Sequence, residues 1–182
     1  MISDVYWVSA AELGAGRLAV AARPRGGDWL DGEVDAWRLA GITHVLSLLT
    51  ASEARELDLG DEAHACGRAG IEFISLPVPD RGVPLSRSTF RETAVACREK
   101  LGCGATVLVH CRQGIGRASM MAAAILAEAG ASAADAFVRI ERARGRPVPD
   151  TEEQRVWITT GFDGTNTRAQ HVTAADAAPP RR

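Results

Sequence analysis

The sequence predicts a three-layer α/β fold in which helices cover both faces of a mostly parallel central sheet. Short apolar segments typical of buried strands alternate along the chain with helical segments. Glycines at Gly41 and Gly70 end the first helical segments directly before such strands. The chain has 182 residues, 46% of them hydrophobic, which is enough for one domain with a sizeable core.

The first quarter of the chain predicts two strands, a helix and a third strand. The two short strands, at residues 6–8 and 18–21, are joined by a glycine-containing turn. After a basic, glycine-rich loop, Asp28 is expected to cap a helix that runs to residue 40. The segment 42–49, in which five of eight residues are Ile, Val or Leu, predicts a buried strand.

The next elements repeat this alternation. Ser52 is a candidate cap for helical sequence that continues over residues 61–69, and a further strand is expected at 71–76. The segment 77–84 contains three prolines and one glycine, so it cannot form regular structure. Because proline restricts the backbone, we expect this loop to be stiff.

The second half predicts one strand and four helices. Ser86 or Ser88 caps a helix that ends near residue 101, and an apolar strand follows at 105–109. The helix over 118–129 is apolar nearly all round, so it is expected to lie at the centre of its layer. Two further helices begin at sequences with capping-box spacing, Ser132-Ala133-Ala134-Asp135 and Thr151-Glu152-Glu153-Gln154.

Composition sets the domain limits and argues against several classes of protein. Periodicity is lost after residue 163, so we expect one domain over 1–163 and a disordered tail over 164–182. The net charge of −2 gives no attraction to nucleic acid or anionic membranes. The cysteines show neither a disulfide framework nor metal-ligand spacing. With neither a signal peptide nor a long apolar run, we expect a soluble cytoplasmic monomer without metal or cofactor.

One stretch, residues 105–117, combines the features of an anion-binding site. An apolar strand ends at Cys111, five residues that include two glycines follow, and Arg117 opens the apolar helix. Backbone N–H groups and the positive end of the helix dipole then face the loop centre. That field favours the Cys111 thiolate, and the planar guanidinium of Arg117 can hold two oxygens of one phosphate. The simplest chemistry is attack by sulfur on phosphorus, whereas the alternative is a buried cysteine followed by an ordinary glycine turn.

The spacing Cys-x5-Arg, with His110 before Cys111 and Gly114 three residues after it, resembles the signature loop of protein tyrosine and dual-specificity phosphatases. The sequence Gly-Ile-Thr-His-Val-Leu at 41–46, between a helix and a strand, also resembles the N-terminal third of dual-specificity phosphatases. The resemblance covers residues 6–157 and implies a small, bacterial-type member with the dual-specificity phosphatase fold.

Asp80 is the candidate general acid. It lies 111 − 80 = 31 residues before Cys111 in the proline loop, and its Pro-Asp pair resembles the acid loop of the family. Classical tyrosine phosphatases carry Trp before this pair, whereas Val78 stands here, which points to the dual-specificity branch. Taken alone, an Asp in a turn is equally explained by its side-chain hydrogen bond to the backbone.

The resemblance implies a double displacement that needs no metal. Cys111 attacks phosphorus while Asp80 protonates the leaving oxygen, and Asp80 then activates water against the phosphocysteine. His110 is expected to orient the cysteine loop, and Asp150 or Gln154 to contact that water, although each is also explained by a structural role. The phosphate oxygens are expected to be held by the amides and side chains of Arg112, Gln113, Gly114, Ile115, Gly116 and Arg117.

One position departs from the family pattern. The family carries Ser or Thr directly after the loop arginine, where the hydroxyl eases departure of the thiolate. Here Ala118 occupies that position and the hydroxyl comes one residue later, at Ser119. A helix turns by about 100° per residue, so Ser119 is expected to point elsewhere. This predicts an active enzyme with slow breakdown of the phosphocysteine.

The expected substrate is a phosphorylated protein or a small phosphate monoester. Arg112 adds a positive charge that suits a dianionic phosphate. Ile115 is apolar where phosphoinositide-directed relatives often carry lysine, which favours phosphoproteins over inositol lipids. The short chain has no room for a tyrosine-recognition insert, so both phosphotyrosine and phosphoserine/threonine are expected to fit. Two alternatives remain open from the sequence: a sulfurtransferase-like cysteine enzyme and a non-catalytic phosphate-binding module.

Overall fold

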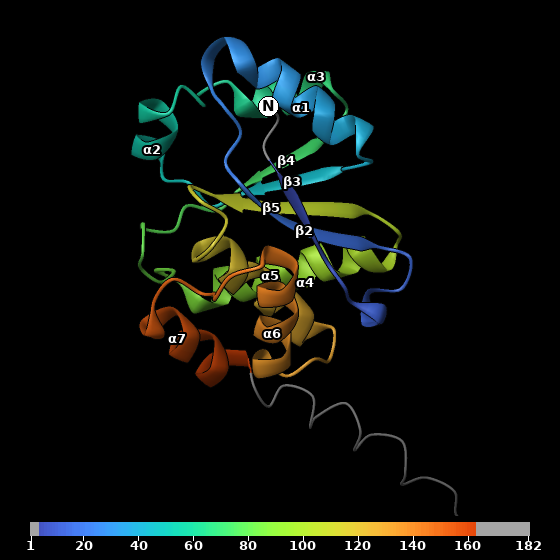
Figure 1. Cartoon of the computed structure of the whole chain (residues 1–182), viewed down its shortest axis with the longest axis vertical. Helices are drawn as coiled ribbons and strands as arrows, with labels where there is room; N and C mark the ends of the chain where they lie inside the picture. The colour runs from blue at the N-terminus through green and yellow to red at the C-terminus, as the bar shows by residue number, and fades with distance from the viewer. Residues whose placement is uncertain (1–3, 163–182) are drawn as a thin grey trace, which may run out of the picture.

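A computed structural model describes residues 4–162, which form a central sheet with helices on both faces (Figure 1). The predicted boundary at residue 163 and the predicted tail at 164–182 lie outside the described residues. No helix within 4–162 is long and apolar enough to cross a membrane.

The described sheet has five strands in the order β1-β2-β5-β3-β4. β1 pairs antiparallel with β2, and all other neighbours are parallel, which confirms the predicted mostly parallel sheet. The strand that ends in Cys111 occupies the centre. The strands are β1 (Val5–Val8), β2 (Arg17–Ala22), β3 (His44–Ser47), β4 (Glu72–Ser75) and β5 (Thr106–Cys111).

Two helical layers enclose the sheet. In Figure 1, α1 and α3 cover one face, α4 to α7 cover the other, and α2 lies beside the carboxyl ends of the parallel strands. The helices are α1 (Leu30–Leu39), α2 (Ala51–Glu56), α3 (Glu62–Arg68), α4 (Arg87–Gly102), α5 (Arg117–Glu128), α6 (Ala133–Arg144) and α7 (Glu152–Phe162). Short 3₁₀ turns at Ala11–Leu13 and Gly27–Trp29 complete the regular structure.

The sheet divides the core into two hydrophobic clusters. Val109 and Cys111 of β5 pack with α4 to α7, whereas Leu108 packs with α1 and α3. This separation follows from the alternation of side chains across a strand. The larger cluster contains α5, which is buried from Arg117 to Ala127 and confirms the prediction of a central, all-round apolar helix.

Two predicted helix caps are wrong. Asp28 does not cap α1, because Gly27 has a positive φ of 58° and donates to the carbonyl of Asp58, which places Asp28 inside a 3₁₀ turn. Thr50, rather than Ser52, caps α2. Its hydroxyl accepts from the Glu53 amide at 3.3 Å, and the Glu53 carboxylate accepts from the Thr50 amide at 3.0 Å, a complete capping box.

The other caps agree with the sequence more closely. Ser86, and not Ser88, accepts from the Thr89 amide at the start of α4. Ser132 caps α6, and Gly145 ends it in the left-handed conformation. The predicted strands at 42–49 and 71–76 are shorter than expected, since regular pairing covers His44–Ser47 and Glu72–Ser75.

Candidate active site

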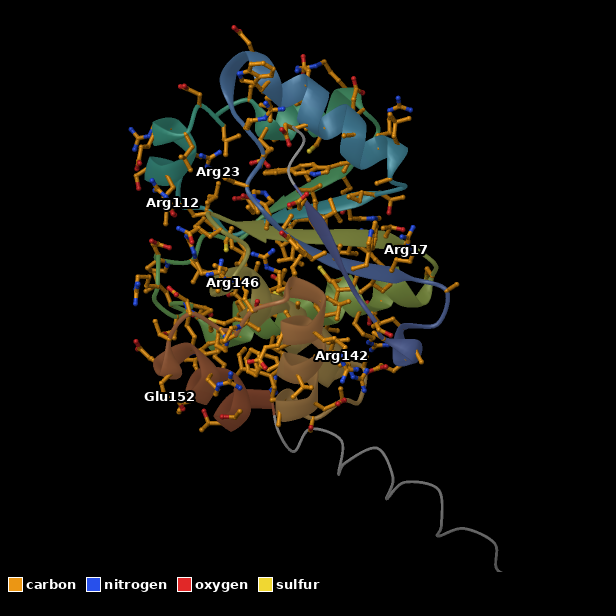
Figure 2. The ribbon with its side chains drawn as sticks, in the orientation of Figure 1. Arg17, Arg23, Arg112, Arg142, Arg146 and Glu152 are labelled. Atoms are coloured by element: carbon orange, nitrogen blue, oxygen red, sulfur yellow. The ribbon has the colours of Figure 1, made fainter. Side chains whose placement is uncertain are left out.

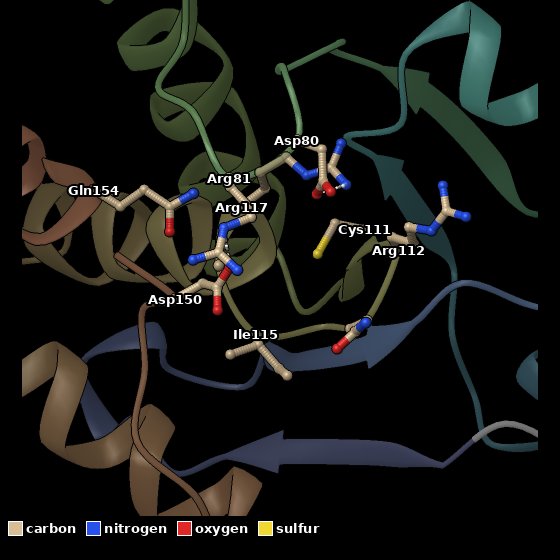
Figure 3. A pocket seen from close by; sticks show the side chains of 10 residues that line it. Asp80, Arg81, Cys111, Arg112, Ile115, Arg117, Asp150 and Gln154 are labelled. Atoms are coloured by element: carbon tan, nitrogen blue, oxygen red, sulfur yellow. Dashed lines mark hydrogen bonds and ion pairs between the residues drawn. The ribbon is translucent and has the colours of Figure 1, made fainter. Parts of the chain in front are cut away.

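A pocket of about 230 Å³ opens at the carboxyl end of β5. It is lined by every residue that the sequence proposed for the site except Gly114 and His110, and Arg81 adds to the lining. Figure 3 shows the Cys111 sulfur directed into this pocket, with Arg117, Asp80 and Gln154 around it. The central strand, the loop at 77–84 and the start of α7 therefore bring together residues far apart in the sequence.

Other segments approach both loop glycines closely. Gly114 has a φ of 66°, and a Cβ there would lie 2.4 Å from the carbonyl of Ala21 in β2. A Cβ on Gly116 would lie 2.7 Å from Oε1 of Gln154. The loop is thus wedged between β2 and α7. Gly116 is the N-cap of α5, and no side chain caps this helix. The first backbone N–H groups of α5 can therefore donate to a bound anion.

Arg117 is fully buried and holds the site together through five hydrogen bonds. Both terminal nitrogens donate to the Glu53 carboxylate, at 2.7 and 2.8 Å. Nη1 also donates to the carbonyls of Leu48 at 3.3 Å and Val78 at 2.9 Å, and Nη2 donates to Asp80 Oδ1 at 2.7 Å. Burial works against the charge, yet Glu53, Cys111 and Asp80 together raise the pKa of Arg117. The guanidinium therefore stays charged and fixed in orientation.

Glu53 is a member of the site that the sequence analysis missed. Burial alone would raise the pKa of this carboxyl, but hydrogen bonds from Arg117 and Thr50 lower it to about 2. The side chain of Glu53 is only 9% exposed. The available signal was Thr50-x-x-Glu53, which indicates a capping box at the start of a helix but gives no sign of a partner 64 residues away.

The loop at 77–84 is anchored on both sides of Asp80. The Val78 carbonyl accepts from Arg117, and the Gly82 carbonyl accepts from Gln154 Nε2 at 2.9 Å. Gly82 N–H also donates to the Pro79 carbonyl, which closes a turn. The side chain of Asp80 is 56% exposed, so its carboxyl reaches both Arg117 and solvent. These hydrogen bonds restrain the segment that carries Asp80, and the stiffness of the loop stays a prediction.

Asp150 approaches the pocket from the segment before α7, and Gln154 from the first turn of that helix. Gln154 is fully buried, and its Oε1 has no hydrogen-bond partner among the described residues. Asp150 Oδ2 lies 3.6 Å from Arg81 Nε, an ion pair at the exposed rim. On the opposite rim, Arg112 pairs with Glu56 at 2.7 Å, and this contact lowers the pKa of Glu56 and raises that of Arg112.

His110 lies behind the loop. Its ring contacts the cluster formed with α1 and α3, on the face of the sheet opposite Cys111, with Nε2 2.9 Å from Glu62 Oε1 and its ring centre 6.0 Å from that of Trp37. Neither ring nitrogen makes an aligned hydrogen bond to a described residue. The expectation that His110 orients the cysteine loop stays a prediction, and any such effect would act through the backbone of β5.

The described residues contain no group of side chains able to hold a metal ion. What the pocket offers instead is a sulfur at the end of the central strand, a buried guanidinium whose charge is balanced by Glu53, and a carboxyl on an anchored loop. These groups suit the binding of an oxyanion and the transfer of a proton to or from one of its oxygens.

Comparison with known proteins gives a consistent result. A family model described as the Swiss Army Knife protein (PTP-SAK), DSP-PTPase phosphatase domain, matches residues 11–160. No curated protein sequence matches the chain. Among solved structures, kinase associated phosphatase with its catalytic cysteine replaced by serine is 18% identical, with a TM-score of 0.79 over 87% of this chain and 93% of that one.

Two other solved structures are similar. Tk-PTP in its active form is 25% identical, with a TM-score of 0.66 over 81% of this chain and 91% of that one. PTPMT1 in complex with PI(5)P is 21% identical, with a TM-score of 0.68 over 86% and 94% of the respective chains. At these identities the solved structures establish the fold, whereas the family match extends over most of the sequence.

Proposed function

Since this chain belongs to the dual-specificity and protein tyrosine phosphatase superfamily, through its PTP-SAK domain, we propose that it hydrolyses phosphorylated proteins through a phosphocysteine intermediate. The observation that carries the proposal is the convergence of Cys111, Arg117 and Asp80 on one pocket at the end of the central strand. Each of these groups meets one requirement of the reaction, namely a nucleophile, an oxyanion ligand and an acid.

In the first displacement, the Cys111 thiolate attacks phosphorus, and the loop amides with Arg117 hold the three non-bridging oxygens. In the free site, Asp80 takes one Nη2 hydrogen of Arg117 and Glu53 takes the other. An arriving phosphate oxygen competes with Asp80 for that hydrogen and thereby releases its carboxyl. The released carboxyl, once protonated, delivers its proton to the leaving oxygen of the ester.

In the second displacement, ionised Asp80 removes a proton from the water that attacks the phosphocysteine. Gln154 is suited to position this water, because its side chain lines the pocket and its amide can both donate and accept hydrogen bonds. Its Nε2 already holds the acid loop through Gly82, so one side chain links the water site to the acid. Cys111 then leaves as a thiolate and inorganic phosphate is released.

The proposed substrates carry phosphotyrosine or phosphoserine/threonine. At the rim, the charge of Arg112 is paired with Glu56, and Ile115 is apolar. These two residues therefore add no unpaired positive charge to the rim. This supports a single phosphate on a protein over the several phosphates of an inositol lipid. A small phosphorylated metabolite is the alternative with the same chemistry.

The decisive experiment measures hydrolysis of an aryl phosphate, with and without vanadate and with and without a chelator. We expect turnover that vanadate inhibits and the chelator leaves unchanged. Cys111→Ser is expected to lose turnover while it still binds phosphate, and acid quenching is expected to trap a phosphorylated wild-type protein. Phosphopeptides compared with PI(5)P then test the substrate class, and faster hydrolysis of the lipid would overturn that part.

The same experiment separates two other functions. Transfer of sulfur from thiosulfate to cyanide without phosphatase activity would identify a sulfurtransferase. Binding of phosphopeptide without turnover would identify a phosphate-binding module. Turnover retained in Cys111→Ser would overturn the assignment of the nucleophile.

A further inference from the structure

Arg144, the last residue of α6, contacts the outer side of the loop that follows Cys111. Its Nη2 donates a hydrogen bond to the carbonyl of Gln113 at 3.2 Å. The guanidinium carbon lies 3.8 Å from the centre of the Tyr6 ring in β1, in a cation–π contact. The side chain is half-buried. A planar group held by a ring on one side and a carbonyl at its tip has little freedom to turn.

The hydrogen bond fixes the direction of one peptide unit in the loop. The Gln113 carbonyl and the Gly114 N–H belong to the same planar trans peptide, so they point in opposite directions. When Arg144 holds the Gln113 carbonyl, the Gly114 N–H is therefore directed away from Arg144. Reversal of this peptide is sterically open at Gly114, because glycine adopts positive and negative φ with similar ease.

We propose that Arg144 is a positioning residue that locks this peptide, so that the Gly114 amide donates to the bound oxyanion. Arg144 does not line the pocket, and it acts through the backbone of Gln113 and Gly114. The inference rests on the proposed function, because it assigns one of the oxyanion donors of that same site. Tyr6 contributes indirectly, because its ring restrains the Arg144 guanidinium that binds the Gln113 carbonyl.

The test compares Arg144→Ala with Arg142→Ala, which removes the same charge from the same helix. Arg142 is exposed, and Figure 2 shows it on the other side of the view from Arg112. Arg144→Lys keeps the positive charge and a donor and serves as the conservative variant. Measurements are inhibition of aryl phosphate hydrolysis by vanadate, the thermal midpoint, and the ¹⁵N–¹H signal of Gly114 during titration with inorganic phosphate.

We expect Arg144→Ala to weaken vanadate inhibition about tenfold, the effect of losing one charge-assisted hydrogen bond. The downfield shift of the Gly114 amide on phosphate binding should appear in the wild type and disappear in this variant. Arg142→Ala should match the wild type in both measurements. Arg144→Lys should recover part of the affinity and part of the amide shift, which a purely structural role would not predict.

An Arg144→Ala protein that keeps the Gly114 shift and inhibition within twofold of the wild type would overturn the inference. If that variant fails to fold, Tyr6→Leu replaces it, and a smaller loss in the same direction is expected; no loss would count equally against the lock. The outcomes also separate this inference from the proposed function. If the wild type shows the Gly114 shift but no turnover, the proposed function is wrong and the role of Arg144 stands. If it shows turnover but no Gly114 shift, the role of Arg144 is wrong and the proposed function stands.

Discussion

Replacing Glu53 by glutamine tests whether the site depends on a buried ion pair. Glu53→Gln keeps the size of the side chain but leaves the Arg117 cation without its main counter-charge. It also turns an amide N–H toward a guanidinium that can only donate. Removing one partner of a buried pair costs about 3–5 kcal/mol. We therefore expect a clear loss of stability, together with a fall in kcat/KM as Arg117 loses its fixed orientation.

The pKa of Glu53 gives a second value for the stability that Glu53→Gln is expected to lose. Burial opposes ionisation, but the hydrogen bonds from Arg117 and Thr50 lower this pKa from 4.5 to about 2. A carboxyl with a lowered pKa stabilises the folded protein fully above pH 4.5, and this contribution is lost as the pH falls toward 2. A difference of 4.5 − 2 = 2.5 pKa units corresponds to about 3 kcal/mol at neutral pH and roughly half of that at pH 3.

The assay is urea unfolding of the wild type and Glu53→Gln at pH 7, 5, 4 and 3. The gap in unfolding free energy should be about 3 kcal/mol at pH 7 and should narrow to roughly half by pH 3. Glu56→Gln is the matched control, because Glu56 lies on the same helix and pairs with Arg112 at the exposed rim. A gap that is constant with pH, or equally large in the control, would refute the reasoning.

Three further predictions concern catalysis. Asp80→Asn should lower kcat/KM, which reports the first displacement, by about 10²–10⁴-fold for alkyl phosphates and far less for p-nitrophenyl phosphate, whose leaving group needs no proton; equal losses in kcat/KM would contradict the role of Asp80 as the acid. Rapid mixing of the wild type with an aryl phosphate should show a burst, and Ala118→Ser should speed steady turnover; no burst and an unchanged rate would count against slow phosphocysteine breakdown. Gly116→Ala would place a methyl group 2.7 Å from Gln154 Oε1 and should reduce kcat/KM at least about tenfold. Gly32→Ala, on an exposed face of α1 with open space around it, should leave activity unchanged and raise stability by about 0.5–1 kcal/mol, so the same loss of activity there would show that the Gly116 effect is not specific.

Features set by neighbouring residues could be predicted from the sequence. The alternation of strands and helices, the buried α5 and the loop from Cys111 to Arg117 all follow from local patterns, and the structure confirms this architecture. The side of the sheet that His110 occupies was also predictable. Successive residues of a strand face opposite sides, so the neighbour of Cys111 must point away from it.

Features set by tertiary contacts could not be predicted. The start of α1 was misplaced because it depends on a hydrogen bond between Gly27 and Asp58, which lie in different loops. The partnership of Glu53 with Arg117 and the contact of Arg144 with Gln113 likewise need the folded chain. The sequence around Glu53 is explained by a helix cap, and Arg144 by a solvated charge. Neither local explanation indicates the distant residue that each one contacts in the fold.

The two anchored carbonyls of the acid loop have a consequence for the kinetics. Only three residues separate Val78 from Gly82, and both ends are bound to side chains of the site itself. A segment so short and so held has no long path to travel between an open and a closed position. Turnover in this protein should therefore be insensitive to the microviscosity of the solvent, so that glycerol or sucrose slows substrate encounter but leaves kcat as it is in plain buffer.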